Sequence, residues 1–474
     1  MKRGAVPALA IGAAIVSALL FLQGCGGGGT GGAGSRPGVN VSRESVATGG
    51  GQASGGALAF GNSGAVLSGT GRFVAFQSDA TDLLGVGGDL NDLSDIFLRD
   101  RQAGTTVRVS VADNGAEAGG VNAGIGSEFP SISPDGRFVA FTSDAENLVA
   151  GDTNVKLDVF LRDTSPLAPS TTRASVGPGG VEANGDSQSF ANAVALDNAG
   201  NLLVVFTSEA TNLVAGDNNA AADIFVRNVT AGTTARASVG AGGAQADNAS
   251  LNPGISTNGR HVAFESAASN LVPSDTNARS DVFVRDLVAG TTVRLSVDNA
   301  GVQGNGDSFS PAISGDGRFV AFESTASNLV PSDTNAVSDV FLHDRDVSGS
   351  GTFDTPGNTS TVRVSVGAGG VQAAGGSFFP AISDDGRFVI FETNAANLDP
   401  FGDGNGATDV YAFDRSGGTL KRLSVNFAGA ESDRGSFQAT VSRGGQVAAY
   451  TSDATNLVSG DTNGLPDIFA APLP

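Results

Sequence analysis

The sequence is poor in the residue types that most often carry catalysis or cross-link small folds: its 474 residues include no Trp, one Cys, one Met and two His. The single cysteine, Cys25, excludes a disulfide bond within the chain. His261 and His343 are too few to supply a histidine-ligated metal centre. No Gly-x-Ser-x-Gly motif occurs, so the nucleophile elbow of α/β-hydrolases is absent as well. We therefore expect a protein that is not an enzyme and has no catalytic residues.

Basic residues are also scarce. The chain has 27 Lys and Arg against 48 Asp and Glu, which gives a formal net charge of −21. Phosphate backbones are bound by clustered basic side chains, and a strongly acidic protein repels them at long range. Nucleic acid is therefore disfavoured as a partner, whereas divalent cations and cationic surfaces are compatible with this charge.

Long amphipathic helices are a third absence. Beyond the N-terminus no segment carries a sustained helical period, while 69 Gly and an aromatic content of 6% are typical of many short strands joined by turns. The segment Ile313–Asp344 shows the pattern: an Asp-Gly turn, the apolar strand Phe-Val-Ala-Phe, a polar Asp-x-Asn loop and a second apolar strand, Asp-Val-Phe. Copies recur with a period of roughly 60 residues, which predicts one closed array of repeats.

Seven such units can be counted. A further strand with the signature Arg-x-Ser-Val follows six of them. These six copies begin at Arg108, Arg173, Arg236, Arg294, Arg363 and Arg422. The seventh copy, Arg43–Val46, stands at the other end of the chain, ahead of the first complete unit. An N-terminal strand that completes the last unit would close a ring and leave no open sheet edge.

The predicted fold class is therefore all-β: a seven-bladed β-propeller of four-stranded antiparallel blades, closed by the N-terminal strand. A six-bladed ring with one degenerate unit is the alternative. A solenoid fits poorly, because it would need distinct capping repeats. We expect residues 39–474 to form this single domain and the protein to be a monomer.

The N-terminus predicts export. Residues 1–24 combine a short basic start with an apolar stretch too short for a membrane span, and Leu22-Gln23-Gly24-Cys25 resembles a bacterial lipobox. We expect residues 1–24 to be a lipoprotein signal peptide, and residues 25–38 to be the lipidated Cys25 and a Gly-rich tether. A free cysteine after an ordinary signal peptide is the alternative. The predicted location is the cell envelope, and Gly26 in place of Asp favours the outer membrane of a Gram-negative cell.

The recurring Ser/Pro-Asp-Gly-Arg-Phe-Val-Ala-Phe followed by Asp-Val-Phe-Leu-Arg-Asp resembles the TolB-type, WD-repeat-like propeller units of exported bacterial proteins. The resemblance covers residues 39–474 and implies the propeller fold. It implies a range of roles: scaffold, partner in a translocation system, or accessory domain of a peptidase. TolB itself carries a separate N-terminal α/β domain, and this chain has only the tether there, a departure that counts against a literal TolB role.

A motif Asp-x-Asn-x-x-x-Asp occurs once in each unit, in the loop between the second and third strands. Asp and Asn oxygens at alternate positions suit Ca²⁺, and the spacing resembles the start of an EF-hand loop, although the closing Glu is missing. Calcium is thus the candidate cofactor. In the structural alternative, the first Asp and the Asn form Asx-turns and the last Asp caps the strand. The candidate ligands are Asp89, Asn91, Asp95, Asp152, Asn154, Asp158, Asp217, Asn219, Asp223, Asp275, Asn277, Asp281, Asp333, Asn335, Asp339, Asp403, Asn405, Asp409, Asp461, Asn463 and Asp467.

Other repeated or unusual residues are interpreted as structural. We expect the Arg of each Arg-x-Ser-Val to form an exposed ion pair with the Asp that ends the third strand, such as Asp100, Asp163 or Asp286. The two histidines stand where other copies have Phe and Arg, which indicates drift of the repeat. The loop Asp346–Ser360 is longer than its counterparts and is interpreted as a tolerated insertion, with a partner-binding loop as the alternative.

The leading functional hypothesis is a lipid-anchored cell-envelope propeller that serves as a binding or scaffold module. Its partner would be a protein, a peptide or a glycan, bound at the acidic rim formed by the Asp-x-Asn loops. One alternative is a hydrolase or lyase with carboxylate or calcium-assisted chemistry. The other is a rigid spacer without a ligand.

Overall fold

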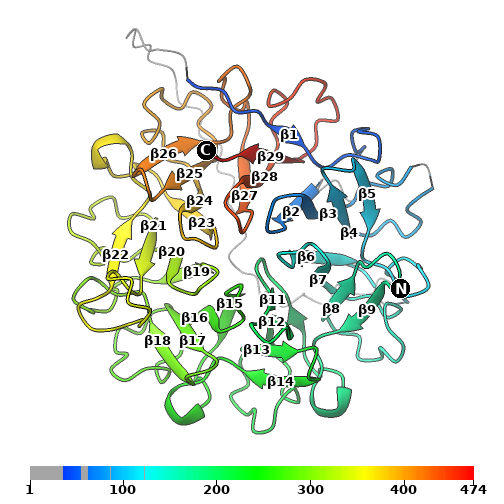
Figure 1. The fold of residues 1–474 in the computed structure, drawn as a ribbon, viewed down its shortest axis with the longest axis horizontal. Coiled ribbons are helices and arrows are strands. Elements are labelled where there is room, and N and C mark those ends of the chain that lie inside the picture. Colours follow the sequence, from blue (N-terminus) through cyan, green and yellow to red (C-terminus); the bar gives the residue numbers. More distant parts are fainter. Residues whose placement is uncertain (1–35, 55–61, 86, 122) are drawn as a thin grey trace, which may run out of the picture. The chain divides into compact units, whose positions relative to one another are not determined.

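Seven antiparallel sheets surround a central axis, so the fold is a seven-bladed β-propeller (Figure 1). The computed structural model describes residues 36–54, 62–85, 87–121 and 123–474. The predicted signal peptide, the lipidation site Cys25 and the tether as far as residue 35 lie outside the described residues. No helix of the described residues is long and apolar enough to cross a membrane. The predicted all-β, seven-bladed fold is confirmed.

The strands of each blade follow one another from the axis outward. Blade 1 has β2 (Asn62–Leu67), β3 (Phe73–Ser78), β4 (Asp95–Asp100) and β5 (Thr105–Arg108). Blade 2 has β6 (Ser127–Ile132), β7 (Phe138–Ser143), β8 (Asp158–Asp163) and β9 (Ser170–Arg173). Blade 3 has a divided inner strand, β10 (Ser187–Gln188) and β11 (Val194–Leu196), then β12 (Leu202–Ser208), β13 (Asp223–Asn228) and β14 (Thr233–Arg236).

The other four blades repeat this order. Blade 4 has β15 (Ser250–Ile255), β16 (His261–Ser266), β17 (Asp281–Asp286) and β18 (Thr291–Arg294). Blade 5 has β19 (Ser308–Ile313), β20 (Phe319–Ser324), β21 (Asp339–Asp344) and β22 (Ser360–Arg363). Blade 6 has β23 (Ser377–Ile382), β24 (Phe388–Thr393), β25 (Asp409–Asp414) and β26 (Thr419–Arg422). Blade 7 has β27 (Ser436–Val441), β28 (Val447–Ser452), β29 (Asp467–Pro472) and, from the N-terminus, β1 (Ser42–Arg43).

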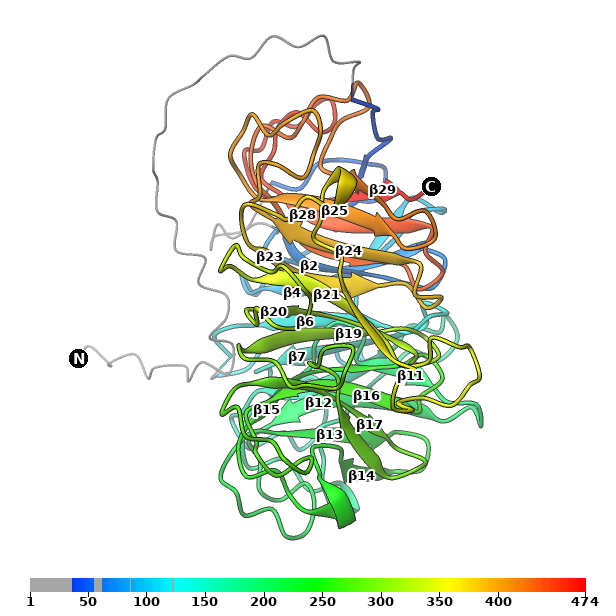
Figure 2. The same cartoon turned by 90° about the vertical axis from the view of Figure 1, so that its left-hand side faces the viewer.

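The ring is closed by the N-terminal strand, as predicted. β1 pairs antiparallel with β29, with Ser42 opposite Ala470 and Arg43 opposite Phe469. The two strands lie side by side at the outer edge of blade 7 (Figure 1). Seen from the edge of the ring, the strands of successive blades lie as tilted layers one above another (Figure 2). Pairing of β1 leaves no unpaired outer edge on β29.

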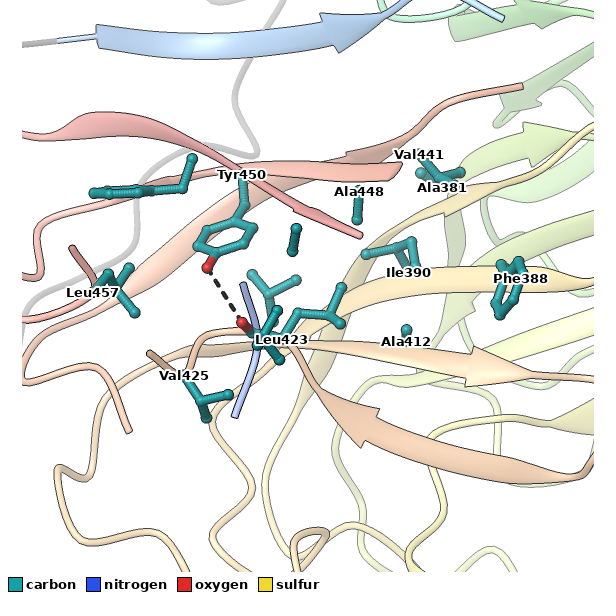
Figure 3. Close-up of a cluster of buried hydrophobic side chains, with 14 of the residues drawn as sticks. Ala381, Phe388, Ile390, Ala412, Leu423, Val425, Val441, Ala448, Tyr450 and Leu457 are labelled. Carbon is teal, nitrogen blue, oxygen red and sulfur yellow. Dashed lines mark hydrogen bonds between the residues drawn. The ribbon is translucent and has the colours of Figure 1, made fainter. Parts of the chain in front are cut away.

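The core lies between neighbouring blades, because both faces of each sheet are covered. In blade 5, Phe322 and Phe341 stack with ring centroids 5.8 Å apart, and both are fully buried. Between blades 6 and 7, Tyr450 packs among Leu423, Val425 and Ile390, and its hydroxyl donates a 3.2 Å hydrogen bond to the carbonyl of Leu423 (Figure 3). The predicted strands that are apolar on both faces therefore have their physical basis in blade-to-blade packing.

The tight turns between the first and second strands follow the predicted Asp-Gly pattern. Gly136 has a φ of 78°, which glycine adopts without steric cost. A Cβ at this position would also stand 2.3 Å from the ring of Phe73 in blade 1. The glycine thus serves the turn and the contact between blades at once.

The inner strands contain a bulge that the sequence did not reveal. The register shifts between Glu128 and Ser131 in blade 2, for example, and Phe129 between them has a φ of 53°. Corresponding shifts occur in blades 1, 4, 5, 6 and 7. The residues with positive φ at these bulges are Gly64, Phe129, Asn252, Ser310, Phe379 and Gln438. A positive φ is costly for residues other than glycine, so neighbouring contacts must hold these bulges in place.

Candidate functional site

The predicted site residues lie on one face of the ring, here called the loop face, which carries the loops between the second and third strands and the segments that join one blade to the next. The Arg of each Arg-x-Ser-Val signature reaches this face. In blade 1, the Arg108 guanidinium lies 3.1 Å from a carboxylate oxygen of Asp95, 3.5 Å from Asp89 and 2.6 Å from Glu117. The Ser110 hydroxyl donates a 2.5 Å hydrogen bond to the other oxygen of Asp95.

This cluster of one Arg between the two Asp residues of the motif recurs around the ring. The shortest distances between Arg and the last Asp of the motif are 3.4 Å for Arg43–Asp467, 3.1 Å for Arg173–Asp158, 3.4 Å for Arg236–Asp223, 3.2 Å for Arg294–Asp281, 3.3 Å for Arg363–Asp339 and 3.2 Å for Arg422–Asp409. The Arg side chains are between 1% and 11% exposed. These are buried ion clusters, whose charges are costly to separate.

The predicted partner of these arginines was wrong. Asp100, Asp163 and Asp286 pair instead with the Arg that precedes the second strand, namely Arg72, Arg137 and Arg260, at 2.6, 2.6 and 2.7 Å. The reason is register: Arg108 lies opposite Phe97, close to the start of its neighbouring strand at Asp95, whereas Asp100 is at the other end. The prediction of exposed pairs was wrong for the same reason, because the start of the third strand is buried.

A third member of each cluster was not recognised from the sequence. It is the Glu or Gln nine residues after the Arg, at the end of a Gly-rich turn that folds back on the strand. These residues are Gln52, Glu117, Glu182, Gln245, Gln303, Gln372 and Glu431. Glu182 accepts from Arg173 at 2.9 Å, whereas Gln245 donates to Asp217 at 2.8 Å. The fixed spacing of this residue in all seven copies was the signal that could have revealed it.

The Asn of each motif serves the loop backbone. The Asn91 side-chain oxygen accepts from the N–H of Leu93 at 2.9 Å, an Asx-turn, and its amide donates to the Ala118 carbonyl at 2.8 Å. Among the described residues no three His, Cys, Asp or Glu side chains are arranged to hold a metal ion. Because a guanidinium already supplies a cation between the two Asp residues, the geometry fits the structural alternative better than a resident calcium ion. Calcium binding stays a prediction.

Blade 6 departs from the pattern. Asp399, outside the motif, replaces the first Asp: it lies 3.3 Å from Arg422 and 2.8 Å from Arg36. Arg36 also donates to the Gly402 carbonyl at 2.9 Å and stacks on Phe401. The residues 36–38, predicted as tether, therefore contact blade 6 before the chain reaches blade 7. Asp403 instead accepts from the Gly406 N–H at 3.2 Å.

Aromatic side chains gather on the inner strands, close to the loop face. These axial phenylalanines are Phe129, Phe190, Phe309, Phe378, Phe379 and Phe437, and all of them are partly exposed. They come from blades 2, 3, 5, 6 and 7, whose inner strands surround the axis (Figure 1). The rings of Phe129 and Phe190 approach to 5.9 Å between centroids across neighbouring blades. Sequence reasoning did not single them out, because the bulge changes which side chains the inner strand presents.

Carboxyl groups on the second strands hold the bulges of the next blade. Glu265 accepts from the Ser310 N–H at 2.7 Å, Glu323 from the Phe379 N–H at 3.0 Å and Glu392 from the Ala439 N–H at 3.3 Å. Burial raises the pKa of Glu323 to about 7 and that of Glu392 to about 8. At neutral pH Glu392 is therefore mostly protonated and Glu323 partly so, which lowers the charge that is buried.

The opposite face of the ring, here called the turn face, carries the turns between first and second strands. On this face, hydrogen bonds connect blades across the central axis. Five backbone hydrogen bonds link the turns of neighbouring blades from Asn258 through Gly315, Asp384, Arg443 and Gly69 to Pro134. The buried Arg443 then reaches across to blades 3 and 4, donating to the Val194 carbonyl at 3.1 Å and the Thr257 hydroxyl at 2.5 Å. No other blade has a basic residue at this turn position.

The histidines and the long loop belong to one structural cluster. His261 and His343 are both buried, and burial lowers the pKa of each to about 4. In the loop Asp346–Ser360, Phe353 packs on His261 with ring centroids 5.4 Å apart. Asp354 forms an ion pair with Arg345. The loop is thus anchored to blade 4, and neither histidine is placed for proton transfer with a ligand.

Comparison with known proteins gives only distant similarities. No family model and no curated protein matches the chain. Solved structures that are similar include TolB from Agrobacterium tumefaciens, with 16% identity and a TM-score of 0.36 over 73% of this chain and 90% of that one. The β-propeller domain of the Trilobed protease from Pyrococcus furiosus has 12% identity and a TM-score of 0.48, over 87% and 95%. Oligogalacturonate lyase from Vibrio parahaemolyticus has 10% identity and a TM-score of 0.49, over 93% and 91%.

Proposed function

We propose that the protein is a binding or scaffold module of the cell envelope, anchored through lipid at Cys25, which takes a protein, peptide or glycan at the axial phenylalanines of its loop face. The observation that carries the proposal is the contrast between the acidic and the aromatic side chains of this face. The acidic side chains of the rim are engaged with arginines inside the blades, whereas the phenylalanines of the inner strands keep part of their surface exposed. Recognition therefore rests on aromatic faces instead of the acidic rim.

The surroundings of the axial phenylalanines support a binding role. Exposed apolar side chains stand on the blade-connecting turns of the same face, where Val181, Val302 and Val371 are 55%, 52% and 51% exposed and Phe427 is 80% exposed. Phenylalanine rings suit both apolar side chains of a protein and the apolar faces of sugar rings.

The experiment compares the wild type with variants that lack one aromatic face. The double variant Phe309→Ser, Phe378→Ser removes two axial phenylalanines, and Leu167→Ser removes a 98% exposed side chain of the turn face as a matched control. Each protein is tested by pull-down from envelope extracts and on a panel of glycans. We expect a saturable ligand that is lost in the double variant and kept in the control. If the double variant still folds and binds every ligand of the wild type equally well, the axial site is refuted.

A further inference from the structure

The residue that follows the third strand has the same backbone position in every blade. Its N–H donates to the carbonyl of the residue that precedes or begins the second strand, at 2.9 Å for Arg101, Thr164 and Leu287, 3.0 Å for Arg345 and 2.8 Å for Val229, Arg415 and Leu473. From this position the side chain points toward the groove between its own blade and the preceding one. The seven side chains can therefore be compared as the residues that stand at seven equivalent grooves.

Arginine occupies three of these grooves, where Arg101 and Arg345 also form ion pairs with Glu44 and Asp354. In blade 6, Arg415 lies over the ring of Phe319 in blade 5, with 4.2 Å between the guanidinium carbon and the ring centroid, and donates to the Gly386 carbonyl at 2.8 Å. Arg345 donates to the Gly317 carbonyl at 2.7 Å, and Arg101 to the Gly71 carbonyl at 2.9 Å. In each case the acceptor is the glycine of the turn in the same blade.

Apolar side chains fill three further grooves. Val229 packs with Phe138, Leu287 with Leu203, and Leu473 in the cluster that contains Phe388. Thr164 of blade 2 differs from all six, because its short side chain turns back and donates to the Arg137 carbonyl at 2.8 Å. Its groove is open to solvent, has a volume of about 480 Å³, and is lined by Phe73, Leu98 and Val107 together with Arg72 and Gly136.

We propose that this groove between blades 1 and 2 is a docking site for an arginine side chain carried by a partner protein. Its walls match those that receive Arg415: Phe73 has Arg72 over one face at 4.8 Å, as Phe319 has Arg318 at 4.6 Å, and the ion pairs Arg72–Asp100 and Arg137–Asp163 correspond to Arg318–Asp344 and Arg387–Asp414. Arginine is thus accepted by this geometry despite the neighbouring arginines, because those are neutralised by Asp.

Two further observations are in keeping with an arginine, and the second favours it over an apolar side chain. No side chain of the described residues donates to the Gly136 carbonyl, which is therefore open to a guanidinium like those that reach Gly71, Gly317 and Gly386. The turn carbonyls of Gly259 and Gly445, whose grooves hold Leu287 and Leu473, likewise receive no side-chain donor among the described residues, so this acceptor permits an arginine without requiring one. The net charge of −21 also draws basic partners toward this chain at long range. A bound guanidinium would stack on Phe73 and donate to Gly136, which lysine cannot do with the same geometry.

The site is on the turn face and is independent of the axial site proposed above. The test uses the full chain and a blocked peptide, acetyl-Gly-Arg-Gly-amide, with Lys and citrulline versions as probes, observed by saturation-transfer NMR. Thr164→Arg fills the groove from within, and we expect it to weaken Arg-peptide binding at least tenfold while the melting temperature stays the same or rises. Leu167→Arg adds the same charge at a 98% exposed position nearby and should bind as the wild type does.

A gain-of-function variant keeps the proposal testable if Thr164→Arg fails to fold. Arg415→Thr should open a second groove, between blades 5 and 6, and raise the number of bound peptides from one to two. The proposal is overturned if the wild type does not bind the Arg peptide, if it binds the Lys peptide equally well, or if Thr164→Arg folds and leaves binding unchanged. Loss of binding in Thr164→Arg together with full binding in Leu167→Arg would establish the site.

Discussion

The protonation of Glu392 gives the sharpest test of the inner-strand geometry. This side chain is 5% exposed, lies opposite Phe378 on the neighbouring strand, and accepts from the N–H of Ala439 in blade 7. Burial raises its pKa to about 8, while the N–H groups of Ala439 and Gln438 lower it and the charge of Glu323 raises it further. Glu392→Gln keeps the shape and the hydrogen-bond acceptor but cannot ionise.

The expected effect depends on pH. Glutamate has an ordinary pKa of 4.5, so between pH 4.5 and about 8 the folded protein holds a proton that the unfolded chain has released. The stabilisation is complete below pH 4.5 and is lost as the pH rises through 8. Because one pKa unit corresponds to about 1.4 kcal/mol, the wild type should lose about 3–4 kcal/mol of unfolding free energy relative to Glu392→Gln between pH 5 and pH 8.

Urea unfolding at pH 5, 6, 7 and 8, followed by circular dichroism, measures this difference directly. Titration of other groups is shared by both proteins and cancels in the comparison. Asp92→Asn, which changes an exposed carboxylate, serves as the control and should show no comparable trend. If the difference between wild type and Glu392→Gln changes by less than about 1 kcal/mol over this range, burial does not keep Glu392 protonated and the reasoning is refuted.

Three further predictions concern closure, packing and the ion clusters. Deletion of residues 39–46 removes β1 and the Arg43 contacts to Asp461 and Asp467, so we expect a lower urea midpoint and aggregation in size-exclusion chromatography; an unchanged midpoint would contradict the closure. Phe322→Ala should cost about 3–5 kcal/mol in urea unfolding, since the ring is fully buried, and a loss below about 1 kcal/mol would contradict its place in the core. Arg294→Met leaves Asp275 and Asp281 without their cation, so it should cost about 3–5 kcal/mol. Calorimetry should then show calcium binding in this variant and not in the wild type, with a chelator control; equal binding by both would mean that the guanidinium does not exclude the ion.

The seven-bladed architecture was predictable because it follows from the number and order of the repeated strand motifs. Seven apolar second strands, six Arg-x-Ser-Val copies and one displaced copy at Arg43 require a strand exchange between the two ends, and the pairing of Arg43 with Phe469 shows it. The Asx-turn of Asn91 was predictable as well, because Asn and Asp in a short polar loop bond to their own backbone.

The sites were less accessible to sequence reasoning. Arg108 belongs to Asp95 instead of Asp100 because of strand register, which no local pattern encodes. The axial phenylalanines depend on a bulge whose positive φ falls on Phe, Ser, Asn or Gln as well as Gly, so no turn residue marks it. The open groove at Thr164 is visible only when seven equivalent positions are compared in space.

The displaced strand β1 also sets the order in which the protein can be completed. β1 precedes blade 1 in the chain and β29 follows blade 6, so blades 1–6 can form from contiguous segments while blade 7 waits for β1 and β29 to meet. Until then Asp461 and Asp467 lack the guanidinium of Arg43, and the acids of the last blade repel one another. Ring closure is therefore a late, long-range step, and such steps slow folding and expose strand edges to association. A circular permutant that makes blade 7 continuous should fold faster than the natural chain.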